Sequence, residues 1–323
     1  MNEELARKFE SWRGLTGPQF HFPIELGKVR EFANALFATD TQYLESDRPV
    51  IPPTFPVVAG YLWGYILESA TDNNELSVVE IDERMSLDAE QEYIYYGPPP
   101  HAGDLLTAQT TVEKVWQKVG RRGDTLTFYR TRSDYHNESG RLVGANVSTS
   151  VVPAGVPNTP SVPSVDYMQL PYSAENDRRD QFHAVKRASW EDLAEGRGPG
   201  VIAMPPLTLT DIVTYQIVSG SRGAAHHDVI AARAQGWPNY FSIAMLHAGL
   251  LGVYATNWLG AENVRRFRLR FLDMIWPGDV LHYDAKVTRL YEEDGVQKAD
   301  IELDCSRADA ESTMNGMATF ELP

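Results

Sequence analysis

The chain has 323 residues, of which 43% are apolar and 11% aromatic, so it can fill sizeable cores and is not disordered. It carries 29 Lys and Arg against 44 Asp and Glu, and this net charge of −15 argues against binding to nucleic acid or to a membrane surface. The N-terminus lacks the apolar segment of a signal peptide, no window is apolar enough for a membrane span, and Cys305 is the single cysteine. We therefore expect a soluble cytoplasmic protein without disulfides.

The first half begins with a short amphipathic helix and continues with a longer apolar one. The short helix is predicted from apolar residues at helical spacing, namely Val29, Phe32, Ala33, Leu36 and Phe37. Residues 56–67 are apolar on nearly all faces, which predicts a buried helix. The segment Pro100-His101-Ala102-Gly103-Asp104 then opens a series of alternating strands, which we expect at 108–116, 125–133 and 142–152.

A stretch rich in Pro, Ser, Asn and Thr follows, from Val152 to Asp180, without an apolar period. This composition is typical of an extended linker. We therefore expect an N-terminal repeat over residues 1–155, a linker over 156–180 and a C-terminal repeat over 181–323.

The second half follows the same plan. Thr210 can cap a helix that carries Ile212, Tyr215 and Val218 and stops at Gly220. An apolar helix is expected over 242–258, and the segment 275–281, with Pro277-Gly278-Asp279, opens strands expected at 282–291, 299–307 and 314–322. A helix that is apolar on most faces needs a sheet curled around it. Each half is therefore predicted to be a helix, a buried helix and an antiparallel sheet.

The most informative segment is Ser219-Gly220-Ser221-Arg222-Gly223-Ala224-Ala225-His226-His227-Asp228. A helix ends at its glycine, small residues make a tight turn, and Asp228 can cap the next helix. This geometry exposes His226 beside a cleft, whereas His227 is expected to be structural. Adjacent side chains diverge and no second cluster has ligand spacing, so a metal site is not predicted here.

The duplicated order of elements, the repeated Gly-Asp strand opening and this segment resemble the MaoC-like acyl dehydratases and R-specific enoyl-CoA hydratases. The resemblance covers most of both halves. It implies an α+β fold, a tandem (double) hotdog in which each repeat is an antiparallel sheet wrapped around a long buried helix. It also implies an acyl thioester substrate on coenzyme A or an acyl carrier protein, no other cofactor, and either a homodimer of double hotdogs or a complex with another hotdog subunit.

The segment departs from the family's usual motif, Ser-Gly-Asp-x-Asn-Pro-[Ile/Leu]-His-x-Asp, at the catalytic Asp. Ser219, Gly220, His226 and Asp228 match, but Ser221 stands at the Asp position. A hydroxyl does not take up a proton at neutral pH, so His226 is the candidate base and Ser221 at most positions water. Losing one acid/base partner typically costs about 10² to 10⁴ in rate.

Several functions stay open at this point. The site is an active one-histidine hydratase, a hydratase that recruits a carboxylate from elsewhere, or a degenerate site that binds acyl thioesters without turnover. A thioesterase with Ser221 as nucleophile is a further alternative. The first half offers no substitute, because Glu45 stands where a His would be required. In related proteins the first half widens the acyl tunnel, which implies a bulky or long acyl group.

Further residues are candidates for substrate binding. The resemblance assigns a backbone amide at the start of the second buried helix to the thioester carbonyl, and Ala244 occupies that place; Gly220 is the second candidate. In the strand expected at 264–272, Arg266, Arg268 and Arg270 share one face, and arginines form bidentate pairs with phosphate. They are candidates for the carrier's phosphates, with a solvated or salt-bridged strand face as the alternative.

Overall fold

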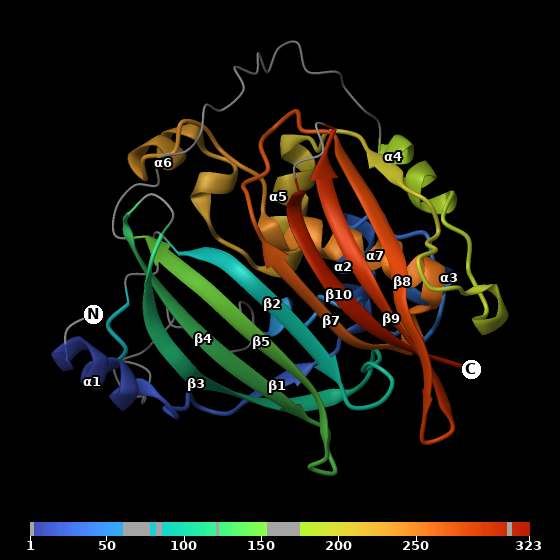
Figure 1. Ribbon diagram of the computed structural model, residues 1–323, viewed down its shortest axis with the longest axis horizontal. Helices are drawn as coiled ribbons and strands as arrows, with labels where there is room; N and C mark the ends of the chain where they lie inside the picture. The colour runs from blue at the N-terminus through green and yellow to red at the C-terminus, as the bar shows by residue number, and fades with distance from the viewer. Residues whose placement is uncertain (1–2, 61–77, 82–85, 121–122, 154–174, 309–311) are drawn as a thin grey trace.

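The computed structural model describes residues 3–60, 78–81, 86–120, 123–153, 175–308 and 312–323 (Figure 1). Ten strands in these ranges form one antiparallel sheet in the order β1-β3-β4-β5-β2-β7-β10-β9-β8-β6. The first half contributes β1 (Phe20–Pro23), β2 (Leu87–Tyr95), β3 (Leu105–Val119), β4 (Thr125–His136) and β5 (Leu142–Pro153). The second contributes β6 (Ile202–Met204), β7 (Val264–Phe271), β8 (Leu281–Glu293), β9 (Val296–Arg307) and β10 (Ser312–Leu322).

The strand order is symmetric about its centre. The set β1-β3-β4-β5-β2 of the first half corresponds to β6-β8-β9-β10-β7 of the second. The halves meet where β2 pairs with β7, with Tyr93 opposite Phe267 and Gln91 opposite Leu269. The fold is therefore the tandem hotdog expected from the sequence, with one continuous sheet running through both repeats.

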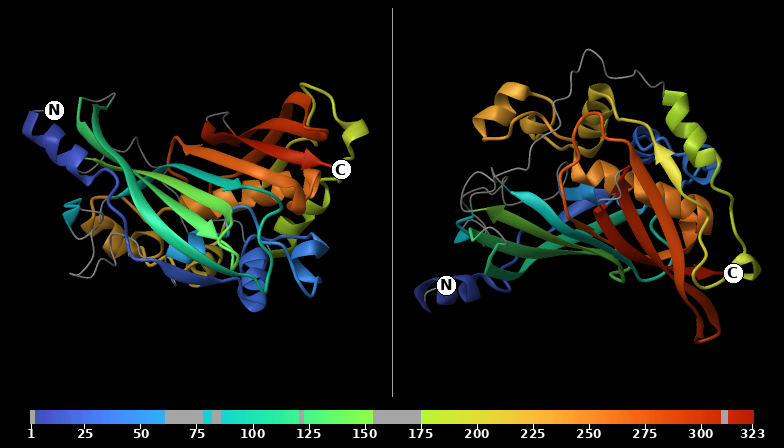
Figure 2. Two further views of the ribbon diagram at one scale, coloured as in Figure 1. Left: turned by 90° about the horizontal axis from the view of Figure 1, so that it is seen from below. Right: turned by 45° about the horizontal axis from the view of Figure 1, so that its top comes forward.

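The helices α2, α5 and α7 lie on one side of the curved sheet (Figure 2). Every residue of α7 after Ala244 is buried, which agrees with the all-round apolarity of its sequence. The described helices are α1 (Glu3–Trp12), α2 (Leu26–Ala35), α3 (Thr41–Leu44), α4 (Glu175–His183), α5 (Leu209–Ser219), α6 (Val229–Ala234) and α7 (Ala244–Leu259), with short 3-10 turns at Trp190–Asp192, Ala224–His226 and Ala261–Asn263.

The two repeats share one hydrophobic core. It contains Phe32 of α2, Tyr93 of β2, Tyr215 of α5, Leu250 of α7 and Phe267 of β7, all buried. The rings of Phe32 and Tyr215, from different repeats, lie 5.6 Å apart. Burial of one such side chain is worth about 1.5 to 3 kcal/mol, so separating the repeats would expose apolar surface on both.

Strands expected from alternation are all present, and three further strands were not expected. These are the short edge strands β1 and β6 and the central strand β2. In β2 the polar residues Glu90 and Gln91 are buried where the repeats meet, so its sequence lacks the apolar alternation that identifies a strand.

One helix cap was predicted incorrectly. The N-cap of α5 is Thr208 and not Thr210, because Thr208 and Asp211 form a reciprocal capping box. The Thr208 hydroxyl accepts from the Asp211 amide (3.3 Å), and the Asp211 carboxylate accepts from the Thr208 amide (2.7 Å). Thr210 lies within the first turn.

Two predicted segments lie largely outside the described residues. Of the buried helix expected at 56–67, residues 61–67 are outside, and within the described part Val58 and Ala59 are buried. Of the expected linker, 156–174 are outside, whereas 175–180 belong to α4. There Arg178 is buried and ion-paired with Asp211 (3.0 Å), which fixes the helix against the start of α5. The domain boundaries therefore stay a prediction.

Within the described ranges, no helix combines the length and apolarity that crossing a bilayer requires.

Candidate active site

The loop that carries the candidate residues begins at Gly220, the C-cap of α5. Gly220 has φ 82°, a left-handed conformation that glycine adopts at low cost, and its amide donates to the Gln216 carbonyl (2.9 Å). The chain turns sharply here, as the sequence predicts. The contact of Gly220 with substrate stays a prediction.

Gln216 holds the loop in place from the buried face of α5. Its amide nitrogen donates to the Gly223 carbonyl (2.9 Å), and its amide oxygen accepts from Nδ1 of His227 (2.7 Å). At the far end Asp228 caps α6 by accepting from the amides of Ile230 (2.7 Å) and Ala231 (3.2 Å). His227 is thus bound to the scaffold, and the loop is fixed on both sides of His226.

His226 lies in the 3-10 turn and is half-buried against Phe241. Its Nδ1 is 3.1 Å from the Phe241 carbonyl oxygen, and the two rings meet edge to face at 4.8 Å and 78°. A carbonyl oxygen accepts but does not donate, so Nδ1 carries the proton. The other nitrogen, Nε2, then has a lone pair, and it makes no hydrogen bond with the described part of the chain.

The surroundings keep this imidazole neutral. Burial lowers the pKa of His226 to about 4; the hydrogen bond to Phe241 raises it, and the nearby His227 lowers it further. A neutral imidazole with its proton on Nδ1 is the form that can accept a proton at Nε2 near pH 7.

Gly223 provides the room that the His226 ring occupies. A Cβ placed on Gly223 would lie 2.8 Å from Cδ2 and 3.1 Å from Nε2 of His226. The backbone of Gly223 has φ −60°, which any residue adopts, so glycine is needed here for space and not for conformation. The departure from the family's Asn at this position therefore fits the observed placement of the ring.

The start of α7 lies close to His226 through Phe241. Phe241, whose carbonyl holds His226, precedes Ala244, the first residue of α7, by three positions. The first amides of a helix have no intrahelical acceptor and form its positive end. Ala244 is partly exposed, and its role as an amide donor to the thioester carbonyl stays a prediction.

Ser221 is half-buried in the same loop. Its amide donates to the Ser219 hydroxyl (3.3 Å), and its own hydroxyl makes no hydrogen bond with the described residues, His226 included. The structure therefore leaves the hydroxyl available and does not show a Ser221–His226 pair. In addition, the group that orients His226 is a carbonyl rather than the carboxylate of a hydrolytic triad.

The structure does not bring the three arginines of β7 to this site. Alternation places Phe267 and Leu269 in the core, and the arginines on the opposite face of the sheet. Ion pairs join Arg266 to Glu92 (2.5 Å), Arg268 to Glu90 (2.7 Å) and Arg270 to Glu90 (3.9 Å). The salt-bridged alternative is therefore what the structure shows, and a role in binding carrier phosphates has no support from this placement.

Sequence reasoning missed two residues that organise the site, Gln216 and Phe241. Gln216 lies four positions after Ile212, on the apolar face of α5, and a polar residue at an apolar position was the available signal. Phe241 acts through its carbonyl, so no side-chain pattern identifies it. Within the described ranges no three His, Cys, Asp or Glu side chains converge as ligands of a metal ion would.

Family models match both halves of the chain. A family model for the FAS1-like dehydratase domain region matches residues 11–145, and a model for the MaoC like domain matches residues 194–306. No curated protein sequence matches the chain significantly.

Solved structures show the same fold at low sequence identity. A MaoC-like dehydratase is 18% identical with a TM-score of 0.73, over 97% of this chain and 98% of that one. The peroxisomal multifunctional enzyme type 2 of Drosophila melanogaster is 19% identical with a TM-score of 0.60, over 95% of this chain and 48% of that one. A Mycobacterium tuberculosis protein described as a double hotdog is 13% identical with a TM-score of 0.59, over 96% of each chain.

Two family models thus cover most of the two repeats, and the solved structures share the fold. The chain belongs to the MaoC-like hydratases and dehydratases of the hotdog fold, with a FAS1-like dehydratase region as its first repeat and a MaoC-like domain as its second.

Proposed function

We propose that the protein adds water reversibly across the trans-2 double bond of an enoyl thioester, carried on coenzyme A or an acyl carrier protein. The observation that carries the proposal is the state of His226. It is neutral, its proton is on Nδ1, and the lone pair of Nε2 makes no hydrogen bond with the described residues.

The proposed reaction needs one base and one set of amide donors. Nε2 of His226 takes a proton from water while the water oxygen bonds to C3 of the enoyl group. The π electrons move toward the thioester carbonyl, where the amides at the start of α7, Ala244 among them, stabilise the enolate. The imidazolium then returns the proton to C2. Ser221 is assigned to holding the water, and no cofactor is consumed.

The proposal also includes a bulky or long acyl group, because the first repeat carries no base of its own and the resemblance implies that such a repeat widens the acyl tunnel. A series of enoyl thioesters of increasing length on both carriers tests this part. The oligomeric state and the cytoplasmic location remain predictions, and light scattering of the purified chain measures the first of them.

Replacing His226 with alanine tests the central assignment. We expect His226→Ala to lower kcat for hydration of crotonyl-CoA or a bulkier enoyl-CoA by about 10² to 10⁴. The control is His21→Ala, which removes an exposed histidine on β1 and should leave the rate unchanged. The measurement is loss of the enoyl absorbance, and an unchanged rate in His226→Ala would remove this residue from the mechanism.

The reciprocal change at Ser221 restores the residue type that the family uses. Ser221→Asp supplies a second acid/base group in the loop of His226 and should raise kcat, by about 10-fold or more if a tenth of the usual contribution of 10² to 10⁴ is recovered. The same absorbance assay measures it. A rate at or below that of the wild type would mean that Ser221 is not a weakened version of the family's site.

A second candidate function is an acyl-thioester-binding subunit without turnover. The observation that favours it is Ser221, which replaces an acid/base residue with a hydroxyl. Such a subunit would bind enoyl-CoA in a calorimeter and show no hydration by itself. A thioesterase would instead release free thiol, which a thiol-reactive dye detects in the same samples.

A further inference from the structure

Phe241, the residue that orients His226, belongs to a small aromatic cluster apart from the main core. Its ring meets Trp237 at 5.2 Å and 64° and Trp276 at 6.0 Å and 71°, and the cluster also contains Ala225 from the histidine loop. Phe241 thus touches His226 with both its carbonyl and its ring. Any shift of Phe241 must therefore change where the imidazole lies.

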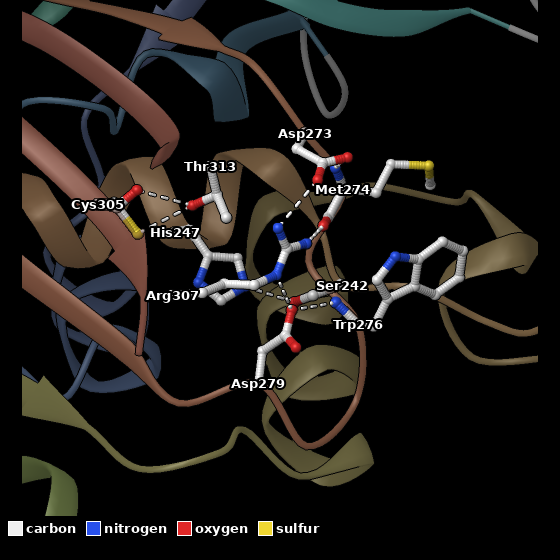
Figure 3. A network of polar contacts seen from close by, with 9 residues as sticks. All are labelled: Ser242, His247, Asp273, Met274, Trp276, Asp279, Cys305, Arg307 and Thr313. Atoms are coloured by element: carbon white, nitrogen blue, oxygen red, sulfur yellow. Dashed lines mark hydrogen bonds and ion pairs between the residues drawn. The ribbon is translucent and has the colours of Figure 1, made fainter. Parts of the chain in front are cut away.

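The residue after Phe241, Ser242, makes two hydrogen bonds, of which Figure 3 shows the one to His247. The amide of Ser242 donates to the carbonyl of Ile275 (2.9 Å), which ties the segment to the loop of residues 273–279. The hydroxyl of Ser242 is hydrogen-bonded to Nε2 of the buried His247 (2.7 Å), which ties it to α7. The position of Phe241 therefore depends on the 273–279 loop.

The guanidinium of Arg307 binds both ends of that loop (Figure 3). Arg307, at the end of β9, donates to the carboxylates of Asp273 (2.9 Å) and Asp279 (3.1 Å) and to the carbonyl of Met274. Asp279 in turn accepts from the amide of Trp276 (2.9 Å). The side chains of Arg307 and Asp279 are 15% and 11% exposed, so these charge-assisted bonds are largely shielded from water.

We infer that Arg307 is a positioning residue for His226, acting through the 273–279 loop and Phe241. Arg307 fixes the loop, the loop holds the Trp276 ring and the Ile275 carbonyl, and these hold Phe241. The effect on rate rests on the proposed function, whereas the effect on the imidazole does not.

The first repeat supplies a matched control of the same chemistry. There Arg48 pairs with Asp104 and donates to the Ala102 carbonyl (3.3 Å), and Asp104 accepts from the His101 amide (2.8 Å). This clamp holds the corresponding Gly-Asp turn in the repeat without the histidine loop. Arg48→Ala therefore removes an ion pair of the same kind, although a more exposed one, without touching the contacts of His226.

The test reads the tautomer of His226 directly. In protein labelled with ¹⁵N-histidine, NMR distinguishes imidazoles protonated on Nδ1 from those protonated on Nε2, and His226→Ala identifies the signal. We expect wild type and Arg48→Ala to show the Nδ1–H form of His226. Arg307→Ala should show a mixture of both forms, because the imidazole is no longer held against the Phe241 carbonyl.

The kinetic arm uses the same variants. Arg307→Ala should lower kcat by about 10- to 10²-fold, the range expected for a misplaced catalytic group, with KM little changed, and Arg48→Ala should leave kcat unchanged. Asp279→Asn is the milder variant if Arg307→Ala does not fold. It keeps an acceptor for the Trp276 amide, weakens the pair with Arg307, and should give the same mixture of tautomers to a smaller degree.

A single Nδ1–H signal in the folded variant, whether Arg307→Ala or Asp279→Asn, would overturn the inference whatever the rate. An equal mixture of tautomers in Arg48→Ala would overturn it too, because the effect would then be general loosening. If the wild type hydrates no enoyl thioester, the proposed function fails while the tautomer comparison still decides the role of Arg307.

Discussion

The two repeats place a loop at the same position, after α2 in the first and after α5 in the second, and use it differently. In the first repeat, residues 38–45 follow α2 and fold into α3. In the second, residues 220–228 follow α5 and present His226.

The loop of the first repeat connects the two repeats through side-chain contacts. Asp40 accepts from the Gln42 amide (2.9 Å) and pairs with Arg187 (2.6 Å) in the second half of the chain. The buried Tyr43 donates its hydroxyl to Thr256 of α7 (3.0 Å). The polar groups that a site would use are here bonded to the protein itself.

Side chains on both sides of His226 bind the loop of the second repeat to the scaffold. Gln216, His227 and Asp228 hold it in place, whereas Nε2 of His226 and the hydroxyl of Ser221 make no hydrogen bond with the described residues. The same position in the fold can therefore hold either a candidate site or a contact between the repeats. What distinguishes them is whether polar groups are left for a ligand.

The largest effect is expected from a substitution that fills the space around the His226 ring. Gly223→Ala puts a methyl group 2.8 Å from Cδ2 of His226, so the ring must move. We expect kcat to fall by about 10²-fold, since a displacement near 1 Å at a catalytic group costs that much. Stability should change little because the side chain gives way rather than the backbone. Steady-state kinetics and thermal unfolding measure the two effects.

The control for this change is Gly27→Ala on α2. Gly27 is exposed, and a Cβ there meets nothing within 4 Å. This variant should keep full activity and gain up to about 1 kcal/mol from the better helix propensity of alanine. Full activity of Gly223→Ala would show that the observed position of the His226 ring is not required.

The first loop should respond in stability and not in activity. Asp40→Ala removes the cap of α3 and the pair with Arg187, and we expect it to lower the free energy of unfolding by about 1 kcal/mol with kcat unchanged. Urea denaturation measures the loss. Glu45→Ala, at the position where the family's motif would need a histidine, is the control and should change neither quantity. A large fall in kcat for either variant would make the first loop part of a site.

The smallest expected effect is that of mild acid on the rate. Because burial lowers the pKa of His226 to about 4, the base stays neutral well below the ordinary histidine value of about 6.5. Between pH 7.5 and 5.5, kcat/KM should therefore change by less than about twofold. A half-maximal rate near pH 6.5 would contradict the buried, neutral imidazole.

The free energy of unfolding should decrease as the pH falls below about 6.5. Between pH 6.5 and 4 the unfolded chain protonates His226 and the folded chain does not, so the free energy of unfolding decreases as pH falls. The stabilisation is fully present above pH 6.5. The buried His247, with its pKa lowered to about 3, acts in the same direction. Urea denaturation at pH 7 and pH 5 measures their combined effect, and His226→Ala should reduce it.

Most of the fold can be predicted from the sequence, because the apolar residues of buried strands and helices recur at the period of the element. The strands β3, β4, β5, β7, β8, β9 and β10, the glycine stop of α5 and the cap at Asp228 are all found near their expected positions. The strand β2 is not predictable in this way, since Glu90 meets its arginine partners from distant strands only in the folded sheet.

The site follows from the sequence only in part. The motif identifies His226 and predicts a turn that presents it, but it does not give the tautomer, which depends on the backbone carbonyl of Phe241 15 positions away. The sequence also does not show that the arginines of β7 form ion pairs. Their partners Glu90 and Glu92 lie in the other repeat, and only the register of β2 against β7 brings them together.

The junction of β2 with β7 has a consequence for how such a protein can diverge. If two identical subunits met along this line, every substitution would appear in both, and a change that strengthened one loop as a joint would abolish the other as a site. A duplicated gene encoding both copies in one polypeptide removes that constraint. Asp40 and His226 can then lie in corresponding loops of the two repeats, the first in contacts between the repeats and the second in the candidate site.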